Sequence, residues 1–388
     1  MGRIDDLIQK YCLEGVEYVK LGDYCPVLRG KRLTKSQLSE EGKYKVFHGG
    51  IDPIGYYDQH NREANTAMVI NVGASAVTVG FSKEEFWSSD GCFCLQHNKD
   101  VNNQFLFYYL QTQEYLLKSR VRHAGIPTLD GQVIEKIEFP LPPLPIQEAI
   151  VEILEKFDRL SAELQAELQA RKQQYEYYRN QLLTRFAPEQ PVTEYSLGDI
   201  CDTLSGFPFD STQFQDNGIR LMRGMNIKRG FLDFSEENNR YWDSTAGLEK
   251  YLLEDQDIVM SMDGSLVGKS FGIIEKKDLP LILVQRVARI RSTKANIRYI
   301  YYCITNFFPD YVDKKKTGGA IPHISMKDIN NFKIVLPSLE EQARIVAILD
   351  KFEALVNDLS QGLPAEIAAV QEQYEYYRNK LLTFKTKE

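Results

Sequence analysis

The sequence predicts a mixed α/β (α+β) protein with an internal pseudo-two-fold repeat. In it, two strand-rich globules are joined by two long antiparallel helices that form a coiled coil. Three observations predict this fold class. The chain of 388 residues repeats itself, each half contains β-branched and aromatic runs separated by Gly, Asn and Asp, and each half closes with a helical heptad pattern. The repeats keep one order, which indicates a tandem duplication of roughly half the chain.

The repeated segments span most of the chain. The phrase QYEYYRNQLLT at 174–184 returns as QYEYYRNKLLT at 373–383 with a single substitution. The other matching pairs are LGDYC at 21–25 with LGDIC at 197–201, 66–81 with 257–273, 107–129 with 299–324, and 147–160 with 342–355. Each half is therefore expected to fold as one copy of the same unit.

A proline-rich hinge, FPLPPLPIQ at 139–147 or VLPSLEEQ at 335–342, precedes each long helix. Proline cannot continue a strand ladder, but it fits the first turn of a helix. The expected domains are an N-terminal helix at 1–15, a first globule at 16–145, a first spacer helix at 146–186, a linker at 187–192, a second globule at 193–340 and a second spacer helix at 341–384.

Apolar side chains recur three or four residues apart along both spacer helices, which is typical of a heptad seam. A seam can be buried against its own globule or against another helix, and two seams of similar length favour mutual packing. The second helix carries four extra residues near SQGLPAE, where we expect Gly362 and Pro364 to interrupt it. The expected seam residues are Phe157, Leu164, Tyr175, Tyr178, Phe352, Leu359, Tyr374 and Tyr377.

Composition limits the classes of function. The net charge of −7 argues weakly against nucleic acid, although local basic clusters can still bind phosphate. No apolar run approaches the roughly 18 residues of a membrane span, and the acidic N-terminus is unlike a signal peptide, so we expect a cytoplasmic protein. The six cysteines show no CxxC pair, which favours buried free thiols over a metal site.

The segment GSLVGKS at 264–270 is the one motif that suggests nucleotide chemistry. A phosphate loop needs four residues between its glycines, whereas Gly264 and Gly268 have three between them. A glycine-rich hairpin is the better interpretation. An enzyme hypothesis would rest on this motif alone.

Taken together, the repeats resemble the specificity (S) subunit of type I restriction–modification systems. The resemblance rests on EYVKLGD and EYSLGD at the starts of the halves, the GIPTL and AIPHI turns, and both YYRNxLLT ends. It rests also on the junctions LPPLPIQEAIVEILEKFD and LPSLEEQARIVAILDKFE. The resemblance covers almost the whole chain.

This resemblance implies a DNA sequence-recognition subunit without catalysis of its own. Each globule would be a target-recognition domain that reads one half of a bipartite, asymmetric duplex target. The helices would set the spacer and dock two methyltransferase (M) subunits, and restriction/translocase (R) subunits would complete the complex. S-adenosylmethionine and ATP with magnesium would be held by those partners. The alternatives are a non-DNA scaffold shaped as a dumbbell, an orphan, and a specificity subunit of another multi-subunit modification enzyme.

Sequence readout needs donors that reach base edges, and phosphate contacts need basic or small polar groups. Acidic neighbours such as Glu63 and Asp263 could orient an arginine or accept a hydrogen bond from a cytosine amino group. Each basic candidate could equally be a solvated surface charge or part of a local ion pair. Arg179 and Arg378, off the seam, are candidates for contact with a partner subunit. In the first globule the DNA-binding candidates are Lys43, His48, Arg62, Lys118, Arg120 and Arg122; in the second they are Arg220, Arg223, Lys228, Lys269, Ser270, Arg286, Lys314, Lys315 and Lys316.

Overall fold

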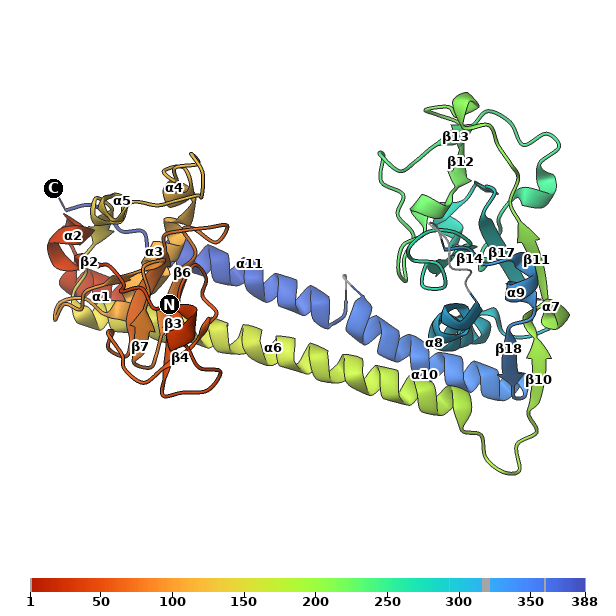
Figure 1. Ribbon diagram of the computed structural model, residues 1–388, viewed down its shortest axis with the longest axis horizontal. Coiled ribbons are helices and arrows are strands. Elements are labelled where there is room, and N and C mark those ends of the chain that lie inside the picture. The colour runs from red at the N-terminus through yellow and green to blue at the C-terminus, as the bar shows by residue number, and fades with distance from the viewer. Residues whose placement is uncertain (1, 293, 316–321, 359–360, 388) are drawn as a thin grey trace. The chain divides into compact units, whose positions relative to one another are not determined.

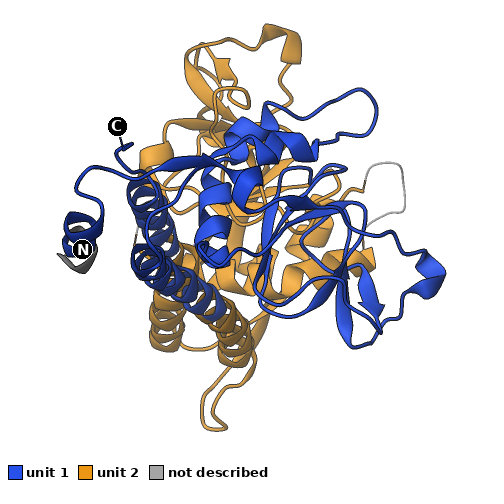
Figure 2. Ribbon diagram, turned by 90° about the vertical axis from the view of Figure 1, so that its left-hand side faces the viewer, with its two compact units in different colours: residues 1–166, 365–388 blue, residues 167–364 orange. Residues whose placement is uncertain are grey.

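The computed structural model describes residues 2–292, 294–315, 322–358 and 361–387, and it divides into two compact units. Unit 1 contains residues 1–166 and 365–388, and unit 2 contains residues 167–364 (Figure 2). Each unit combines one globule with parts of the long helices. The sequence assigned the helices to separate domains, and those predicted boundaries stay predictions.

Unit 1 begins with a short helix and builds three small sheets (Figure 1). β3 pairs in parallel with β7, and the other pairings are antiparallel. The strand orders are β1-β9, β2-β8-β5-β6 and β4-β3-β7. The elements are α1 (Gly2–Tyr11), β1 (Tyr18–Lys20), α2 (Leu21–Tyr24), β2 (Val27–Leu28), β3 (Tyr44–Phe47), β4 (Gly55–Tyr57), β5 (Thr66–Ile70), β6 (Val79–Ser82), β7 (Phe86–Ser88), β8 (Cys92–Leu95), α3 (Asn103–Thr112), α4 (Glu114–Lys118), α5 (Gly131–Glu135), β9 (Glu138–Pro140) and the start of α6 (Leu144–Thr184).

Unit 2 repeats this arrangement strand by strand. Its strand orders are β10-β18, β11-β17-β14-β15 and β13-β12-β16, with β12 parallel to β16 as β3 is to β7. The predicted duplication is thereby confirmed at the level of sheet topology. The elements are β10 (Thr193–Ser196), α7 (Leu197–Ile200), β11 (Cys201–Ser205), β12 (Ile219–Met222), β13 (Tyr241–Trp242), β14 (Ile258–Ser261), β15 (Phe271–Ile273), β16 (Leu281–Leu283), β17 (Val287–Ser292), α8 (Ile297–Lys315), α9 (Met326–Asn330), β18 (Lys333–Leu336) and α10 (Leu339–Asn357); α11 (Leu363–Leu381) lies mostly in unit 1.

A buried glutamine ties each long helix to its globule. In unit 1 the side chain of Gln147 accepts a hydrogen bond from the Asn102 N–H (2.7 Å) and donates to the carbonyls of Asp100 (3.0 Å) and Pro142 (2.7 Å). Asn102 in turn caps α3, since its side chain accepts from two N–H groups of the first turn. The matching bonds of unit 2 join Gln342 to Asn296 (2.9 Å) and Pro337 (2.8 Å).

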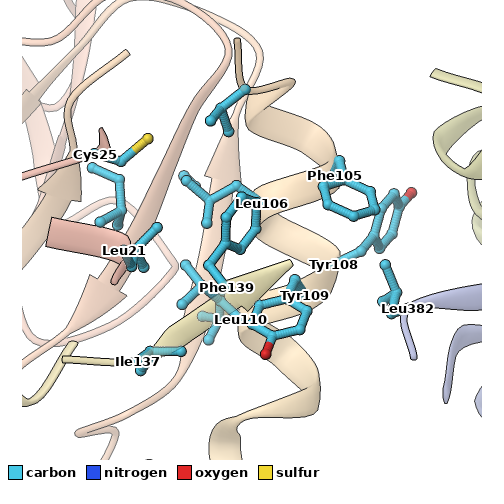
Figure 3. Close-up of a cluster of buried hydrophobic side chains, with 14 of the residues drawn as sticks. Leu21, Cys25, Phe105, Leu106, Tyr108, Tyr109, Leu110, Ile137, Phe139 and Leu382 are labelled. Carbon is cyan, nitrogen blue, oxygen red and sulfur yellow. The ribbon is translucent and has the colours of Figure 1, made fainter. Parts of the chain in front are cut away.

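The core of unit 1 gathers around α3, whose apolar side chains are buried on several sides (Figure 3). Phe105, Tyr108 and Phe139 are fully buried, and the hydroxyl group of Tyr109 reaches the Glu138 carbonyl at 2.5 Å. The start of α6, including Ile146 and Leu154, belongs to the same core. The long helix is therefore packed against its own globule at this end as well as against another helix. The first turns of α6 are buried against their own globule, and the residues that follow pack against another helix, so each of the two interpretations holds for a different part of α6.

Within unit 1, α11 lies beside the first half of α6 and runs in the opposite direction (Figures 1 and 2). The Phe157 ring packs against Tyr374 and Tyr377, with centroid distances of 6.2 and 5.7 Å. Burial raises the pKa of the Tyr374 hydroxyl to about 12. Leu164, another of the predicted seam residues, is also buried.

Within unit 2 the same aromatic group forms with the roles of the two copies exchanged. Phe352 of α10 packs against Tyr175 and Tyr178 of α6, with centroid distances of 6.4 and 6.0 Å. Burial raises the pKa of Tyr175 to about 12, as it does for its counterpart in unit 1. The seam residue Leu359 lies outside the described residues. Each unit thus contains one Phe-with-two-Tyr contact, built from one copy's phenylalanine and the other copy's tyrosines.

The second spacer helix is interrupted where the sequence predicts. α10 ends at Asn357 and α11 begins at Leu363. A Cβ atom on Gly362 would lie 2.5 Å from the Ala354 carbonyl oxygen and 2.8 Å from that of Leu355, so only glycine allows this close approach. The four extra residues of the second copy are therefore accommodated by a break between two helices.

Other sequence predictions can also be checked. Residues 264–270 join β14 to β15 in an antiparallel hairpin, as predicted, and no helix follows as a phosphate loop would require. All six cysteines are free and buried. Over the described ranges, no group of His, Cys, Asp and Glu side chains is arranged to hold a metal ion. Nor does this part of the chain contain a helix long and apolar enough to span a membrane.

Candidate nucleic-acid interface

Each unit presents a cluster of four loop segments held together by backbone hydrogen bonds. We define the loop cluster of unit 1 as residues 47–49, 71–73, 89–91 and 127–129, and the loop cluster of unit 2 as residues 222–224, 261–264, 284–286 and 322–324. These segments follow or precede the strands β3, β5 and β8 in unit 1 and β12, β14 and β17 in unit 2. The clusters bring together segments that are far apart in the sequence.

The backbone of the two clusters matches bond for bond. In unit 1 the Gly73 N–H donates to the Pro127 carbonyl (2.9 Å) and the Leu129 N–H to the Asn71 carbonyl (2.9 Å). The Asn71 N–H donates to Gly91 (3.3 Å). The corresponding donors of unit 2 bind in the same way: Gly264 to Pro322 (3.1 Å), Ile324 to Met262 (3.0 Å) and Met262 to Arg286 (2.9 Å). The hairpin is thus joined to residues 127–129 in unit 1 and to residues 322–324 in unit 2 by the same backbone bonds.

The side chains on this matched backbone differ. When the two clusters are matched by these bonds, His48 corresponds to Arg223, since they directly follow β3 and β12. Gly91 corresponds to Arg286, since they directly precede β8 and β17. The same match pairs Val72 with Asp263 and Thr128 with His323, which occupy equivalent isolated bridges. The two clusters therefore present different hydrogen-bonding groups from one backbone framework.

In unit 2 the cluster carries an exposed ionic group. The Arg286 guanidinium donates to Asp263 Oδ2 at 2.7 Å, and its side chain remains 70% exposed. The His323 ring nitrogen Nδ1 contacts the other carboxylate oxygen of Asp263. Asp263, one of the acidic residues that the sequence offered as a partner for an arginine, thus contacts Arg286. His323 was missed, although it stands where the repeated turns GIPTL and AIPHI differ.

Two other arginines, in β12 and directly after it, are partly buried against aromatic rings. Arg220 lies over Phe234 at 4.7 Å and Arg223 over Phe214 at 5.3 Å. Burial, followed by the nearby charge of Arg240, lowers the pKa of Arg223. A guanidinium stacked in this way is held in place while its edge stays able to donate.

Other predicted residues of unit 2 lie elsewhere. Lys228 is 3.6 Å from Asp233, and Lys269 lines a cavity of about 880 Å³ together with Tyr175 and Arg179. Ser270 is only 3% exposed, which removes its side chain from the candidate DNA contacts; the spacing after Gly268 had suggested an accessible position. Lys314 and Lys315 end α8 and are exposed, whereas Lys316 lies outside the described residues.

In unit 1 two of the predicted residues belong to the loop cluster or border it. The His48 Nδ1 atom accepts the Gly91 N–H at 3.1 Å and lies 3.2 Å from Asp90. Arg122 is exposed, pairs through its backbone with Thr128 of the cluster and lies 3.6 Å from Asp130. The unit 1 cluster contains no arginine or lysine, whereas its counterpart contains Arg223 and Arg286, so the unit 1 cluster is the less basic of the two.

The other candidates of unit 1 are separate from the cluster. Lys43 precedes β3 and so lies at the opposite end of that strand from His48. Arg62 donates to the carbonyls of Asn61 and Arg29, both at 2.6 Å, which ties it to its own fold. Lys118 and Arg120 are exposed at and after the end of α4, with Lys118 3.4 Å from Glu114.

The repeated phrase on the helices offers a second kind of surface. Arg179 and Arg378 each lie over a tyrosine of their own helix, at 5.1 and 5.3 Å from the rings of Tyr175 and Tyr374. Arg179 also donates to Asn306 at 3.0 Å, so both arginines are engaged within their units. Tyr177 and Tyr376, which are not among the residues predicted from the sequence, are 60% and 59% exposed. Their position one residue from the seam was the signal that could have identified them.

A duplicated framework that holds two different loop clusters defines a class of protein with two non-identical recognition surfaces. A family model described as "Type I restriction modification DNA specificity domain" matches residues 13–171 and 189–369. The match covers most of the chain, and the chain belongs to this family.

Curated relatives and solved structures agree with the family. The specificity subunit of the Escherichia coli type I restriction enzymes EcoR124I and EcoR124II is 38% identical over 262 residues, which are 64% of this chain and 63% of that protein. The MjaVIII specificity subunit of Methanocaldococcus jannaschii is 27% identical, covering 88% of this chain and 87% of its own length. The S subunit of a type I system from M. genitalium has a TM-score of 0.62 at 17% identity, covering 95% and 96% of the two chains, and thus shares the fold.

Proposed function

We propose that this chain is the DNA sequence-recognition subunit of a type I restriction–modification complex, and that each unit reads one half of a bipartite, asymmetric duplex target. The observation that carries the proposal is the pair of loop clusters, in which a matched backbone presents different side chains. Two surfaces of this kind suit two different short sequences, because base edges are distinguished by the donors and acceptors placed against them. We also propose that the protein acts in the cytoplasm.

The chain itself is proposed to carry no catalytic step. Methylation with S-adenosylmethionine would be performed by two methyltransferase subunits, and ATP-dependent restriction with magnesium by restriction subunits. Recognition would need these partners, since the net charge of −7 gives the chain little general attraction to DNA.

The repeated phrase is the proposed docking surface for the two methyltransferase subunits. A nearly identical chemical surface presented twice suits two copies of one partner, and Tyr177 and Tyr376 offer an exposed aromatic ring at each. Each ring is held edge-on against its neighbour, Tyr178 at 5.4 Å or Tyr377 at 5.2 Å. Aromatic side chains of this kind are common anchors of protein interfaces.

Methylation mapping tests the proposed function. Cells that carry the complete system should methylate a two-part motif with a fixed gap, and the motif should disappear when the gene for this chain is deleted. An unchanged methylation pattern after the deletion would refute the proposal. Gel shifts with the reconstituted complex test the alternative of a scaffold that binds no DNA. A sequence-dependent shift would exclude the scaffold, because a scaffold gives none.

The role of the helices as a spacer has its own test. Four residues, about one helical turn, can be inserted beside Gly362, where the chain already accommodates an insertion of that length. The gap between the half-sites should change while both half-site sequences stay the same. Changed half-site sequences with an unchanged gap would mean that the helices do not set the spacing.

A further inference from the structure

Arg286 occupies an unusual backbone position. It lies in the turn between β16 and β17 with a φ of +64°, in the left-handed region that residues other than glycine rarely adopt. The equivalent residue of unit 1 is Gly91. Non-glycine residues held in this region are strained, and they are concentrated at functional sites because the surrounding structure must hold them there.

The surrounding structure holds this arginine at both ends. Its carbonyl accepts the Met262 N–H at 2.9 Å, and its guanidinium donates to Asp263 at 2.7 Å. The Asp263 side chain is only 16% exposed, and it is itself held by His323. Asp263 and His323 are joined through an isolated backbone bridge as well. The arginine side chain therefore has a fixed base although most of it faces solvent.

Most of the donor capacity of this guanidinium is left for a ligand. The bond to Asp263 uses one N–H of the five that an arginine offers, and 70% of the side chain is exposed. A planar guanidinium forms two parallel hydrogen bonds with the O6 and N7 atoms of guanine in the major groove. Holding it in advance lowers the conformational entropy lost on binding.

We propose that Arg286 recognises a guanine in the half-site read by unit 2, with Asp263 and His323 as residues that position it. The inference rests on the proposed function and names one base contact within it. The matched positions of unit 1 are Gly91, Val72 and Thr128, which hold no comparable donor. The contact is therefore specific to one half of the target.

The test uses the complete restriction–modification complex in cells, with the methylated motif mapped for each variant. Arg286→Gly removes the donor, and glycine adopts the left-handed φ of this turn without strain. Arg286→Lys keeps the charge but lacks the planar fork. Both variants should lose about tenfold in preference for guanine at one position of one half-site, and the other half-site should stay unchanged.

Two further variants test whether Asp263 positions Arg286 and whether the loss of any basic residue of unit 2 would change the motif. Asp263→Asn should relax the preference at the same position by a smaller factor, because the guanidinium is then held less firmly. Lys333→Ala is the matched control: Lys333 is an exposed basic residue of unit 2 that pairs with Glu194 in the β10-β18 sheet. It should leave the motif unchanged.

Three outcomes would overturn the inference. An unaltered motif in both Arg286 variants excludes a base contact. A uniform decrease of methylation at all sites, with base preferences intact, identifies a phosphate contact instead. Relaxation at a position other than guanine assigns a different base. Failure of the proposed function would look different from all of these outcomes, because the complex with the wild-type chain would then methylate no gapped motif.

Discussion

Unit 1 and unit 2 are built alike and differ mainly where the loops meet. Their sheets have equivalent strand orders, and Gln147 and Gln342 each accept from an asparagine N–H and donate to a proline carbonyl at the base of a long helix. Gln147 donates to the Asp100 carbonyl as well. A tyrosine of α3 and the equivalent tyrosine of α8 also form matching hydrogen bonds. Tyr108 donates to Asp158 at 2.5 Å, and Tyr302 donates to Glu353 at 2.9 Å. The loop clusters share only the backbone. The comparison shows that the duplicated contacts are those on which the fold depends.

The largest effect is expected from removing the buried glutamines. Gln147→Leu replaces the amide with an apolar group and leaves the Asn102 N–H and two carbonyls without their partner, which should destabilise unit 1 by about 3 kcal/mol. Gln342→Leu removes two bonds of the same kind and should cost unit 2 about 2 kcal/mol. Hydrogen–deuterium exchange of each variant measures the opening free energy in each unit. Equal loss of protection in both units would show that they do not open separately.

The exchanged aromatic groups make a second, more symmetrical test. Phe157→Ala in unit 1 and Phe352→Ala in unit 2 each remove a half-buried ring that contacts two tyrosines. Each should cost about 2 kcal/mol, less than a fully buried phenylalanine because part of the ring is already exposed. The two values should agree within about 0.5 kcal/mol if the groups are equivalent. Thermal unfolding with exchange measurements on each unit provides both values, and a difference above that limit would break the equivalence.

The sequence predicted the parts of this fold that depend on local pattern. The repeat and the heptad seam could be recognised because burial on one face imposes a regular spacing on apolar residues. The break near Gly362 and the hairpin at 264–270 were predictable because glycine and proline act on the backbone beside them. In each of these cases the cause lies within a few residues of the effect.

The parts that failed depend on contacts between distant residues. The pairing of Asp263 with His323 joins positions 60 residues apart, and nothing near either residue indicates it. Nothing in the sequence around Arg289 indicates that it is buried and paired with Asp202, a residue 87 positions away. Ser270 was misjudged because its burial comes from the fold of unit 2 as a whole.

A smaller effect is expected where the two cores differ. Arg289 of β17 is 6% exposed and pairs with Asp202, whereas the equivalent position of β8 in unit 1 is the buried Cys94. Asp202→Asn removes the charge beside a buried guanidinium and should cost unit 2 about 1 kcal/mol, since Asp202 itself is 60% exposed and screened by solvent. Chemical denaturation monitored in unit 2 checks this value. Asp216→Asn, an acidic surface residue of the same unit, is a control that should change little.

The smallest effect on stability, and a clear effect on assembly, is expected for the exposed tyrosines of the repeated phrase. Tyr177→Ala and Tyr376→Ala remove rings that face solvent, so each should change the unfolding free energy by less than about 0.5 kcal/mol. If each ring anchors one methyltransferase subunit, each single variant should weaken one of two binding events by about tenfold, and the double variant should weaken both.

Titration calorimetry with the purified methyltransferase subunit distinguishes these cases through the number of tight sites. One tight site should remain in either single variant and none in the double variant. The matched control is Lys172→Ala on α6, an exposed residue outside the repeated phrase. Two unchanged tight sites in the double variant would show that the phrase is repeated for its seam alone, as the contacts of Tyr175 and Tyr374 already require.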